Sequence, residues 1–298
     1  MQAESSVDAS EWEKRGIAAD AAGQHAEAEQ HFSRAVALDD SRSISWVGLA
    51  FSLINQKRTD DAVTSLRRAH AARPTCGIVG HLLNAMTGSN SQRAPNDYVA
   101  FLFNGYADNF DGHLANLQYQ GPQMLATLAL RGGWAADGSR RIIDLGCGTG
   151  LSGMPFRAYA ARLEGADLAA AMLQQAINRG IYDHLWHGEV HAVLRQLPPA
   201  SFDAAVAADT LIYIGDLAEL FRLVHAVLKP GGDFLFTVEL TNGGFTLVKS
   251  GRYQHGHDYL LRCAEGLFTL ADSLDAPIRV EAGQALPGRA YRFVKSST

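Results

Sequence analysis

The 298-residue chain has only three cysteines, Cys76, Cys147 and Cys263, which are far apart and odd in number. This pattern argues against a disulfide framework or a cysteine zinc site and favours reduced thiols in a cytoplasmic protein. Basic residues are also scarce, since 26 Lys and Arg against 31 Asp and Glu give a net charge of −5. We therefore expect no nucleic-acid partner. No apolar run is long enough to span a bilayer, and the stretch Met1–Trp12 is too polar for a signal peptide, so we expect no membrane segment.

The most informative stretch covers residues 141–153, where Ile142 and Ile143 lead into Asp144 and then into a run of glycines. This order predicts a strand, a tight turn and a helix. Glycine tolerates positive φ angles and lets a ligand approach where a Cβ would collide. The spacing is G-x-G-x-G, whereas the dinucleotide fingerprint is G-x-G-x-x-G. An acid before the glycines suits a cationic ligand with an ammonium and a sulfonium group better than a pyrophosphate.

The string Asp144-Leu-Gly-Cys-Gly-Thr-Gly150 resembles motif I of the class I S-adenosylmethionine-dependent methyltransferases. The alternatives are an unrelated glycine-rich turn and a dinucleotide-binding dehydrogenase. The resemblance implies S-adenosyl-L-methionine as the cofactor and a Rossmann-like, seven-stranded, mostly parallel sheet whose last strand is antiparallel. In this loop it implies as cofactor-binding residues Asp144, Gly146, Cys147, Gly148, Thr149 and Gly150.

Beyond the motif, strand-like and helical segments alternate, which predicts an α/β fold with a mostly parallel sheet covered on both faces. Strands are expected over 141–145, 163–167, 185–190, 202–207 and 234–240, with the last ones from 268 and over 290–295. Helices are expected over 152–161, 169–179, 216–228 and 259–267. The segment Lys229–Gly232 should end one helix and turn the chain into the fifth strand.

Acids recur where the expected strands end, and open α/β sheets bind ligands at this edge. Asp167 closes the second strand, Glu189 the third, and Asp209 follows the fourth. The resemblance implies that Asp167 accepts from the ribose hydroxyls, Glu189 accepts from the adenine amino group, and Asp209 faces the sulfur. It adds to the cofactor site Leu168, Met172 and Val190. Each acid taken alone is better explained as a solvated loop carboxylate, but four acids in register at four strand ends favour a ligand site.

The first third of the chain repeats itself, because aligning Trp12 with Trp46 gives a period of 34 residues. This resembles two tetratricopeptide repeats followed by a capping helix over 77–86. Small residues expected to let the helices approach closely are Ala28, Ala35, Ala62 and Ala69. A polar, breaker-rich linker over 88–96 follows, so we expect a helical domain over 1–92 and a methyltransferase domain over 93–298. The repeats are either a protein-docking or self-association platform, or an accessory pack for the second domain.

An aromatic-rich helical stretch over 98–130 resembles the segment ahead of the core domain in small-molecule methyltransferases, which folds over the cofactor. A second polar stretch, 250–257, follows the expected fifth strand. Candidates for orienting the acceptor or taking its proton are Tyr106, His113, Tyr213, Arg252 and His255. Histidine is included because its pKa lies nearest neutrality. Two histidines at 255 and 257 lack further ligands, so we expect no metal site.

These observations favour a methyltransferase that transfers a methyl group to a small-molecule acceptor through an O, N or S atom that the sequence leaves open. One alternative is a protein methyltransferase that recruits its target through the repeats. The amide-recognition motif of the Asn/Asp-Pro-Pro-Tyr type is absent after the fourth strand, where Ala208-Asp-Thr-Leu211 stands instead, which argues against N-methylation of nucleic acid or planar amides. A second alternative is a cofactor-binding scaffold without catalysis.

Overall fold

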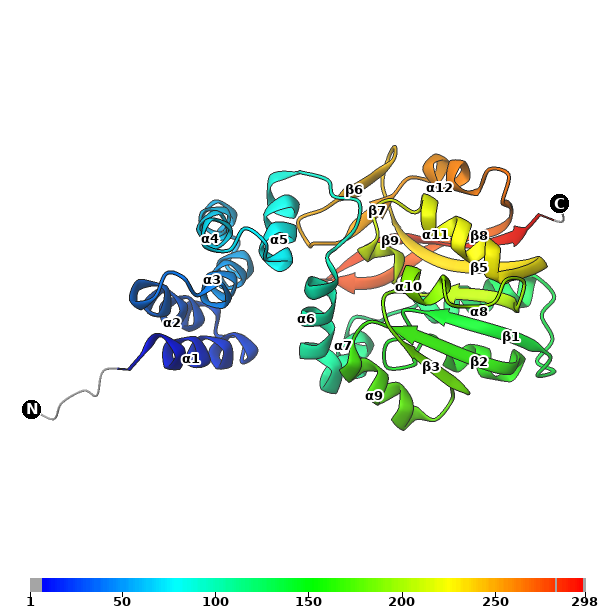
Figure 1. Ribbon diagram of the computed structural model, residues 1–298, viewed down its shortest axis with the longest axis horizontal. Coiled ribbons are helices and arrows are strands. Elements are labelled where there is room, and N and C mark those ends of the chain that lie inside the picture. The colour runs from blue at the N-terminus through cyan, green and yellow to red at the C-terminus, as the bar shows by residue number, and fades with distance from the viewer. Residues whose placement is uncertain (1–6, 282, 297–298) are drawn as a thin grey trace, which may run out of the picture. The chain divides into compact units, whose positions relative to one another are not determined.

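The structure is a computed structural model that describes residues 7–281 and 283–296. The first residues of the polar N-terminal stretch, 1–6, lie outside the described residues. The chain divides into two compact units, one running to Ser91 and including Val248–Gly251, the other comprising Gln92–Leu247 and the chain from Arg252 onward (Figure 1). None of the helices among the described residues combines the length and hydropathy needed to cross a bilayer.

The first unit is helical, as the repeat pattern predicts. Its described part contains α1 (Ala9–Ala21), α2 (His25–Leu38), α3 (Ser43–Asn55), α4 (Thr59–Ala72) and α5 (Gly77–Thr87). The four alanines expected at helix contacts, Ala28, Ala35, Ala62 and Ala69, are fully buried. The prediction of closely approaching helices in this region is therefore confirmed.

The aromatic ring of Phe32 on α2 explains how three of these helices fit together. Phe32 is 2% exposed. A Cβ added to Gly16 on α1 would lie 2.8 Å from this ring, and one added to Gly48 on α3 would also collide with it. Two glycines on different helices thus leave the space that one buried aromatic side chain fills.

The second unit is built on a mixed sheet, which the structure describes as nine strands in the order β3-β2-β1-β4-β5-β7-β6, with β9 pairing with β5 and β8. The strands are β1 (Arg140–Leu145), β2 (Ala160–Asp167), β3 (His184–His187), β4 (Phe202–Ala207), β5 (Leu228–Leu240), β6 (Phe245–Leu247), β7 (Tyr253–His255), β8 (Phe268–Glu281) and β9 (Gln284–Lys295). The pairs among β1 to β5 are parallel, and β9 is antiparallel to β5. The mostly parallel sheet and its antiparallel last strand are confirmed.

Helices cover both faces of this sheet (Figure 1). Successive strand residues point to opposite faces. Accordingly, Ile143 belongs to a core with α11 (Ala218–Val227) and α12 (His257–Ala264), whereas Ile142 belongs to a core with α8 (Gly121–Arg131). The remaining helical elements are α6 (Asn96–Tyr106), η1 (Ala107–Asn109), α7 (Phe110–Asn116), η2 (Met154–Tyr159), α9 (Ala170–Arg179), α10 (Val190–Leu194) and η3 (Leu211–Tyr213).

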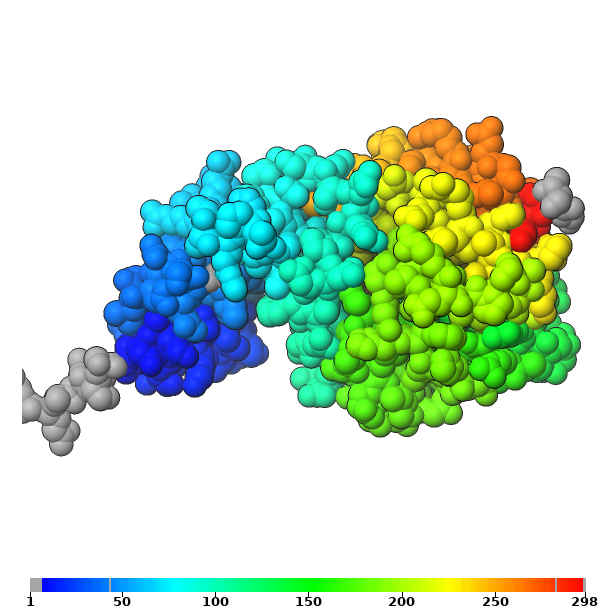
Figure 2. Space-filling view, viewed as in Figure 1, coloured from blue at the N-terminus to red at the C-terminus, as the bar shows by residue number. Residues whose placement is uncertain are grey.

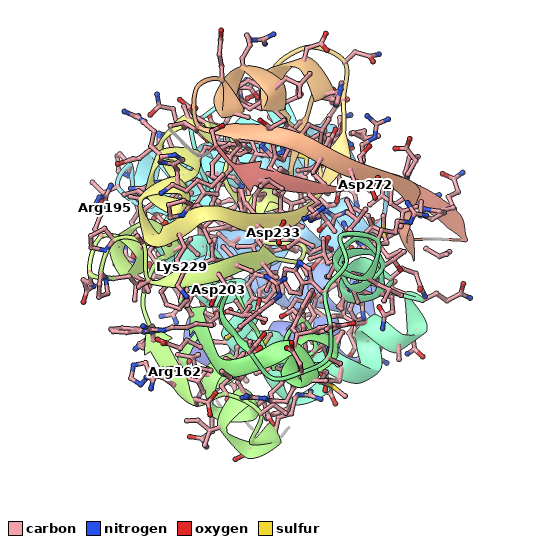
Figure 3. All side chains as sticks on the ribbon, turned by 90° about the vertical axis from the view of Figure 1, so that its right-hand side faces the viewer. Arg162, Arg195, Asp203, Lys229, Asp233 and Asp272 are labelled. Carbon is pink, nitrogen blue, oxygen red and sulfur yellow. The ribbon has the colours of Figure 1, made fainter. Side chains whose placement is uncertain are left out.

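The amino ends of the central strands are tied together by one carboxylate. Asp203, at the start of β4, accepts a hydrogen bond from the backbone N–H of Arg141 on β1 at 2.7 Å. Its other oxygen pairs with Lys229 Nζ on β5, also at 2.7 Å, and Figure 3 labels these two side chains next to each other. The glycine loop lies at the opposite edge of the sheet, where the parallel strands have their carboxyl ends.

Four local predictions differ from the structure. The helix expected over 152–161 is the short 3-10 helix η2, because Gly153 and Pro155 interrupt the run and β2 already begins at Ala160. The third strand ends at His187, and Glu189 caps α10 instead of closing the strand. Residues 229–232 lie inside β5 as an irregularity in its pairing with β4. The expected seven strands become nine, because β6 and β7 form in the stretch 245–255.

The end of the expected linker is held by the second unit. The carbonyl of Gln92 accepts hydrogen bonds from the N–H groups of Gly215 and Asp216 at 2.8 and 2.7 Å, and the N–H of Ala94 donates to the carbonyl of Tyr213 at 2.9 Å. These backbone bonds fix the start of the unit beside the loop that follows β4.

Replacing Phe32 by alanine should destabilise the first unit by about 3–5 kcal/mol, because a buried aromatic side chain leaves a cavity that its neighbours fill only in part. Hydrogen exchange of the amides in α1 to α3 measures this effect separately from the sheet. Leu38→Ala on the same helix is the control, since Leu38 is 60% exposed. Equal exchange rates in the two variants would show that the Phe32 ring does not hold these helices together.

Candidate active site

The glycine loop after β1 adopts the backbone that its sequence predicts. Gly146, Gly148 and Gly150 have φ angles of 70°, 55° and 97°, a region that residues with a Cβ rarely occupy. A Cβ on Gly146 would collide with the side chain of Thr210, whose hydroxyl donates to the Leu145 carbonyl at 2.7 Å. The loop therefore lies directly against the segment that follows β4.

Asp144 is fully buried at the end of β1. Its Oδ2 accepts hydrogen bonds from the Tyr182 hydroxyl at 2.6 Å and from the Ser152 hydroxyl at 2.7 Å. Its Oδ1 has no hydrogen-bond partner among the described residues. Burial raises the pKa of Asp144 to about 6. A buried carboxylate with one unpaired oxygen is suited to a cationic group of a ligand.

Three glycines make room for the ring of Tyr182. A Cβ on Gly150 or on Gly165 would lie 3.1 Å from ring carbons of Tyr182, and one on Gly153 would collide with its hydroxyl. Gly165 belongs to β2 and the other two flank the turn after β1. These glycines thus allow Tyr182 to reach Asp144, in addition to any space they leave for a ligand.

Asp167, at the end of β2, is bound to the same loop. Its Oδ2 accepts from the N–H of Gly148 at 2.9 Å, and its Oδ1 accepts from the N–H of Ala169 at 2.8 Å. Burial raises its pKa. Each oxygen keeps a lone pair for a further donor. The carbonyl of the adjoining Leu168 accepts from His187 Nε2 at 3.1 Å, which links this corner to the end of β3.

Glu189 and Met172 lie beside Asp167 along the sheet edge. Burial alone would raise the pKa of Glu189, but the hydrogen bond from His191 Nδ1 lowers it to about 2. Glu189 is therefore ionised, and it also caps the helix that starts at Val190. The Val190 residue is 9% exposed. Met172 is fully buried against Phe110 and other residues of the segment ahead of β1.

The segment 96–116 contacts the glycine loop. Asp111 accepts from the Thr149 hydroxyl at 2.5 Å and pairs with Arg179, whose Nε donates to the Thr149 carbonyl at 2.7 Å. A Cβ on Gly148 would be 3.8 Å from the ring of Phe110. In the space-filling view the teal surface of α6 lies against green α9, where Asn104 accepts from the N–H of Ala171 (Figure 2).

Three of the expected acceptor-side residues come from this cover and from η3. Tyr106 is 49% exposed, and its ring stacks on that of His113 with centroids 5.9 Å apart. Tyr213 packs edge-on against Phe103 at 5.3 Å. Burial raises the pKa of Tyr213, so its hydroxyl stays protonated at neutral pH. The structure packs Tyr213 against the cover segment, whereas Tyr106 and His113 are exposed.

His255 has the surroundings of a structural histidine. It is fully buried, and its Nε2 donates to the carbonyls of Ile214 at 2.8 Å and Gly215 at 3.2 Å. Burial lowers its pKa to about 4, so the ring is neutral at pH 7 and binds protons weakly. A role as general base stays a prediction, and this geometry gives it no support.

Arg252 and Asp209 meet in a cluster of ionised side chains at the ends of β4 and β5. Arg252 Nε pairs with Glu239 at 2.8 Å, and one of its terminal nitrogens pairs with Glu281, also at 2.8 Å. Arg279 pairs with Asp209, Glu239 and Glu281. We call this group, Asp209, Glu239, Arg252, Arg279 and Glu281, the ion cluster.

Comparison with known proteins places this geometry in a family. A model of the methyltransferase domain matches residues 143–236. The ubiquinone biosynthesis O-methyltransferase of Xanthomonas campestris pv. campestris is 30% identical over 169 residues, which cover 55% of this chain and 69% of that protein. The chain belongs to the class I S-adenosylmethionine-dependent methyltransferases. The malonyl-[acyl-carrier protein] O-methyltransferase of Pseudescherichia vulneris is 31% identical over 142 residues, 47% of this chain and 52% of that protein.

The chain thus spans about half the length of the malonyl-[acyl-carrier protein] methyltransferases that it matches. Among solved structures, the cyclase SpnF superposes with a TM-score of 0.54 at 18% sequence identity. The superposed part covers 70% of this chain and 100% of the SpnF chain. A methyltransferase of Burkholderia thailandensis that acts on 1,6-didemethyltoxoflavin superposes with a TM-score of 0.53 at 19% sequence identity. This match covers 70% of this chain and 93% of that chain. At these identities the likeness shows the methyltransferase fold alone.

Within this family fold, the predicted residues at the ends of β1 and β2 come together, since Asp167 binds the loop that Asp144 opens. Cys147 is buried at 2% exposure, its pKa is raised by burial, and all three cysteines are free. Among the described residues, no group of His, Cys, Asp or Glu side chains is arranged to hold a metal ion.

Sequence reasoning missed Tyr182, Asp111 and Arg279, whereas Tyr119 lies in the aromatic stretch over 98–130 that the resemblance already singled out. Tyr182 lies 38 residues beyond Asp144, and Arg279 lies 70 residues beyond Asp209. No local pattern links such distant positions. Asp111 carried a weak signal, because it is an acid inside the aromatic stretch that was expected to cover the cofactor.

Cofactor binding should weaken as the pH falls through about 6, because protonation of Asp144 removes the charge that attracts a cationic ligand. Tyr182→Phe should move this midpoint to higher pH, since the lost hydrogen bond favours the carboxylate. Calorimetric titration with S-adenosylmethionine between pH 5 and 8 measures both effects. Tyr159→Phe is the control, because Tyr159 packs against Trp134 and not on Asp144. A pH profile that is the same in all three proteins would refute the assignment.

Proposed function

We propose that this chain is an S-adenosylmethionine-dependent methyltransferase that acts on a small-molecule acceptor. The observation that carries the proposal is the connected site at the carboxyl ends of β1 and β2. There the glycine loop, the unpaired oxygen of Asp144 and the loop-bound carboxylate of Asp167 occupy one edge of the sheet. A sheet of this kind binds its ligand at that edge.

In this proposal each acid binds a different part of the cofactor. Asp167 accepts from the two ribose hydroxyls with the lone pairs that Gly148 and Ala169 leave free. The unpaired oxygen of Asp144 receives the ammonium group. Glu189, ionised by its bond to His191, accepts from the adenine amino group. Residues lining the adenine and the methionyl part are Gly146, Cys147, Thr149, Gly150, Leu168, Met172, Val190 and Asp209.

The transfer itself requires mainly positioning. The acceptor atom attacks the methyl carbon in line with the departing sulfur, and the sulfonium is already a good leaving group, so holding the two partners in register supplies most of the catalysis. In this proposal Tyr106, Tyr213 and the second terminal nitrogen of Arg252, which pairs with no carboxylate of the cluster, orient the acceptor. If the acceptor arrives protonated, His113 is a more accessible candidate base than His255, because His113 is exposed and His255 is buried.

We further propose that residues 1–92 form an accessory domain of tetratricopeptide type in a cytoplasmic protein, with the catalytic domain over 93–298. The break between the compact units at Ser91 and Gln92 supports this boundary to within one residue. The helix pairs and their fully buried alanines support the repeat assignment. No observation favours a protein substrate for these repeats.

Asp167→Ala should weaken binding of S-adenosylmethionine by about 1.5–3 kcal/mol, the range for a hydrogen bond to a charged group. Isothermal titration calorimetry on the folded variant gives this number. Asp137→Ala is the matched control, since Asp137 is an exposed loop acid that bonds only Ser139. Unchanged affinity in the Asp167 variant would remove this residue from the ribose site.

The reaction is tested by incubating the full chain with methyl-labelled S-adenosylmethionine and a cell extract. Label should appear in small molecules that pass a filter retaining macromolecules. Label in retained protein would favour the protein-methyltransferase alternative. A chain that binds the cofactor but transfers no label to either fraction would be a scaffold.

A further inference from the structure

The ion cluster joins five charged side chains of the second unit through ion pairs. Asp209 follows β4, Glu239 lies in β5, Arg279 and Glu281 lie in β8, and Arg252 precedes β7. Three carboxylates therefore face two guanidinium groups. With all five ionised, the cluster carries one net negative charge.

Both arginines in the cluster are committed to carboxylates. Arg279 is 4% exposed, and all three of its nitrogens pair with cluster acids. Arg252 pairs through Nε and one terminal nitrogen, which leaves only its second terminal nitrogen for another partner. Recognition of an anion by arginine depends on an open, two-pronged guanidinium group. The cluster does not present one.

The cluster adjoins the loop that we assign to the cofactor. Asp209 has a φ angle of 54°, which is uncommon outside glycine and indicates a backbone held in place by its surroundings. Its N–H donates to the Thr237 hydroxyl at 2.9 Å, and its side chain pairs with Arg279. The next residue, Thr210, lies against Gly146 of the glycine loop. Asp209 is thus the cluster acid nearest the reacting end of the site.

Two tyrosines complete these surroundings. Burial, and then the charge of Asp209, raise the pKa of Tyr119, while burial and the neighbouring Tyr98 raise that of Tyr213. Both hydroxyls are therefore uncharged at neutral pH, and neither has a hydrogen-bond partner among the described residues. An acceptor beside Asp209 therefore contacts uncharged hydroxyls and carboxylates. Of the arginine nitrogens in the cluster, one terminal nitrogen of Arg252 pairs with no cluster carboxylate.

We propose that the methyl acceptor is uncharged or cationic where it faces Asp209, such as an alcohol, a phenol or an amine, and that the site discriminates against carboxylates and phosphates there. This inference rests on the function proposed above. An anion brought out of water beside Asp209 is repelled by the one net negative charge that remains after Arg279 and Arg252 offset two of the three carboxylates. A hydroxyl or ammonium group can instead donate to this carboxylate and bond to the free tyrosine hydroxyls.

The test divides a metabolite extract at pH 7 by ion exchange into anionic, uncharged and cationic pools. Each pool is incubated with the full chain and methyl-labelled S-adenosylmethionine at saturation. Label should enter the uncharged or cationic pool at least about tenfold more than the anionic pool. Highest incorporation in the anionic pool would overturn the inference while leaving the methyltransferase proposal intact. No incorporation in any pool would instead contradict the methyltransferase proposal and the inference with it.

Two variants link the selection to Asp209. Asp209→Asn should lower kcat/KM for the labelled acceptor by about 10- to 100-fold, the effect of losing a hydrogen bond to a charged group, and should reduce the preference against the anionic pool. Glu265→Gln, an exposed acid outside the cluster, should match the wild type. Retained cofactor binding shows that the variant is folded. If Asp209→Asn does not fold, Glu281→Gln serves instead, because it also removes one negative charge from the ion cluster and its side chain is 35% exposed. Wild-type selection in the folded variant would refute the inference.

Discussion

The buried carboxylate of Asp144 is the constraint on which the surrounding structure depends. A carboxylate out of water is unstable unless hydrogen bonds compensate it. Here two hydroxyls bond one oxygen, and the tyrosine that supplies one of them needs the space left by three glycines. The glycines after β1 therefore serve two purposes at once. They shape the turn, and they allow the acid to be buried with one oxygen still unpaired.

The other acids on this edge are stabilised in different ways. Asp167 is held by backbone N–H groups of the glycine loop, Glu189 by a histidine, and Asp209 by an arginine. As a result their pKa values diverge, with that of Glu189 low and those of the two aspartates raised by burial. One edge of the sheet thus holds carboxylates of different basicity, which suits a ligand with several distinct polar groups.

The two ends of the strands are used differently. At the amino ends, each oxygen of Asp203 has a partner, the Arg141 N–H or Lys229 Nζ, and these contacts tie strands together. At the carboxyl ends, Asp144 Oδ1 stays without a hydrogen-bond partner among the described residues. Stability and ligand binding are thereby separated along the length of the same strands.

Short-range patterns in the sequence determined much of this protein. The alternation of strands and helices, the glycine turn after Asp144 and the repeat with its buried alanines all depend on neighbours within one or two elements, so they could be predicted. Glu189 was misplaced by one element, because a strand end and a helix cap use the same local signals. Tyr182 on Asp144, Arg279 on Asp209 and the burial of His255 were decided only by the tertiary structure. These contacts join positions that the sheet brings together from distant parts of the chain, and no local pattern records which side chains will meet.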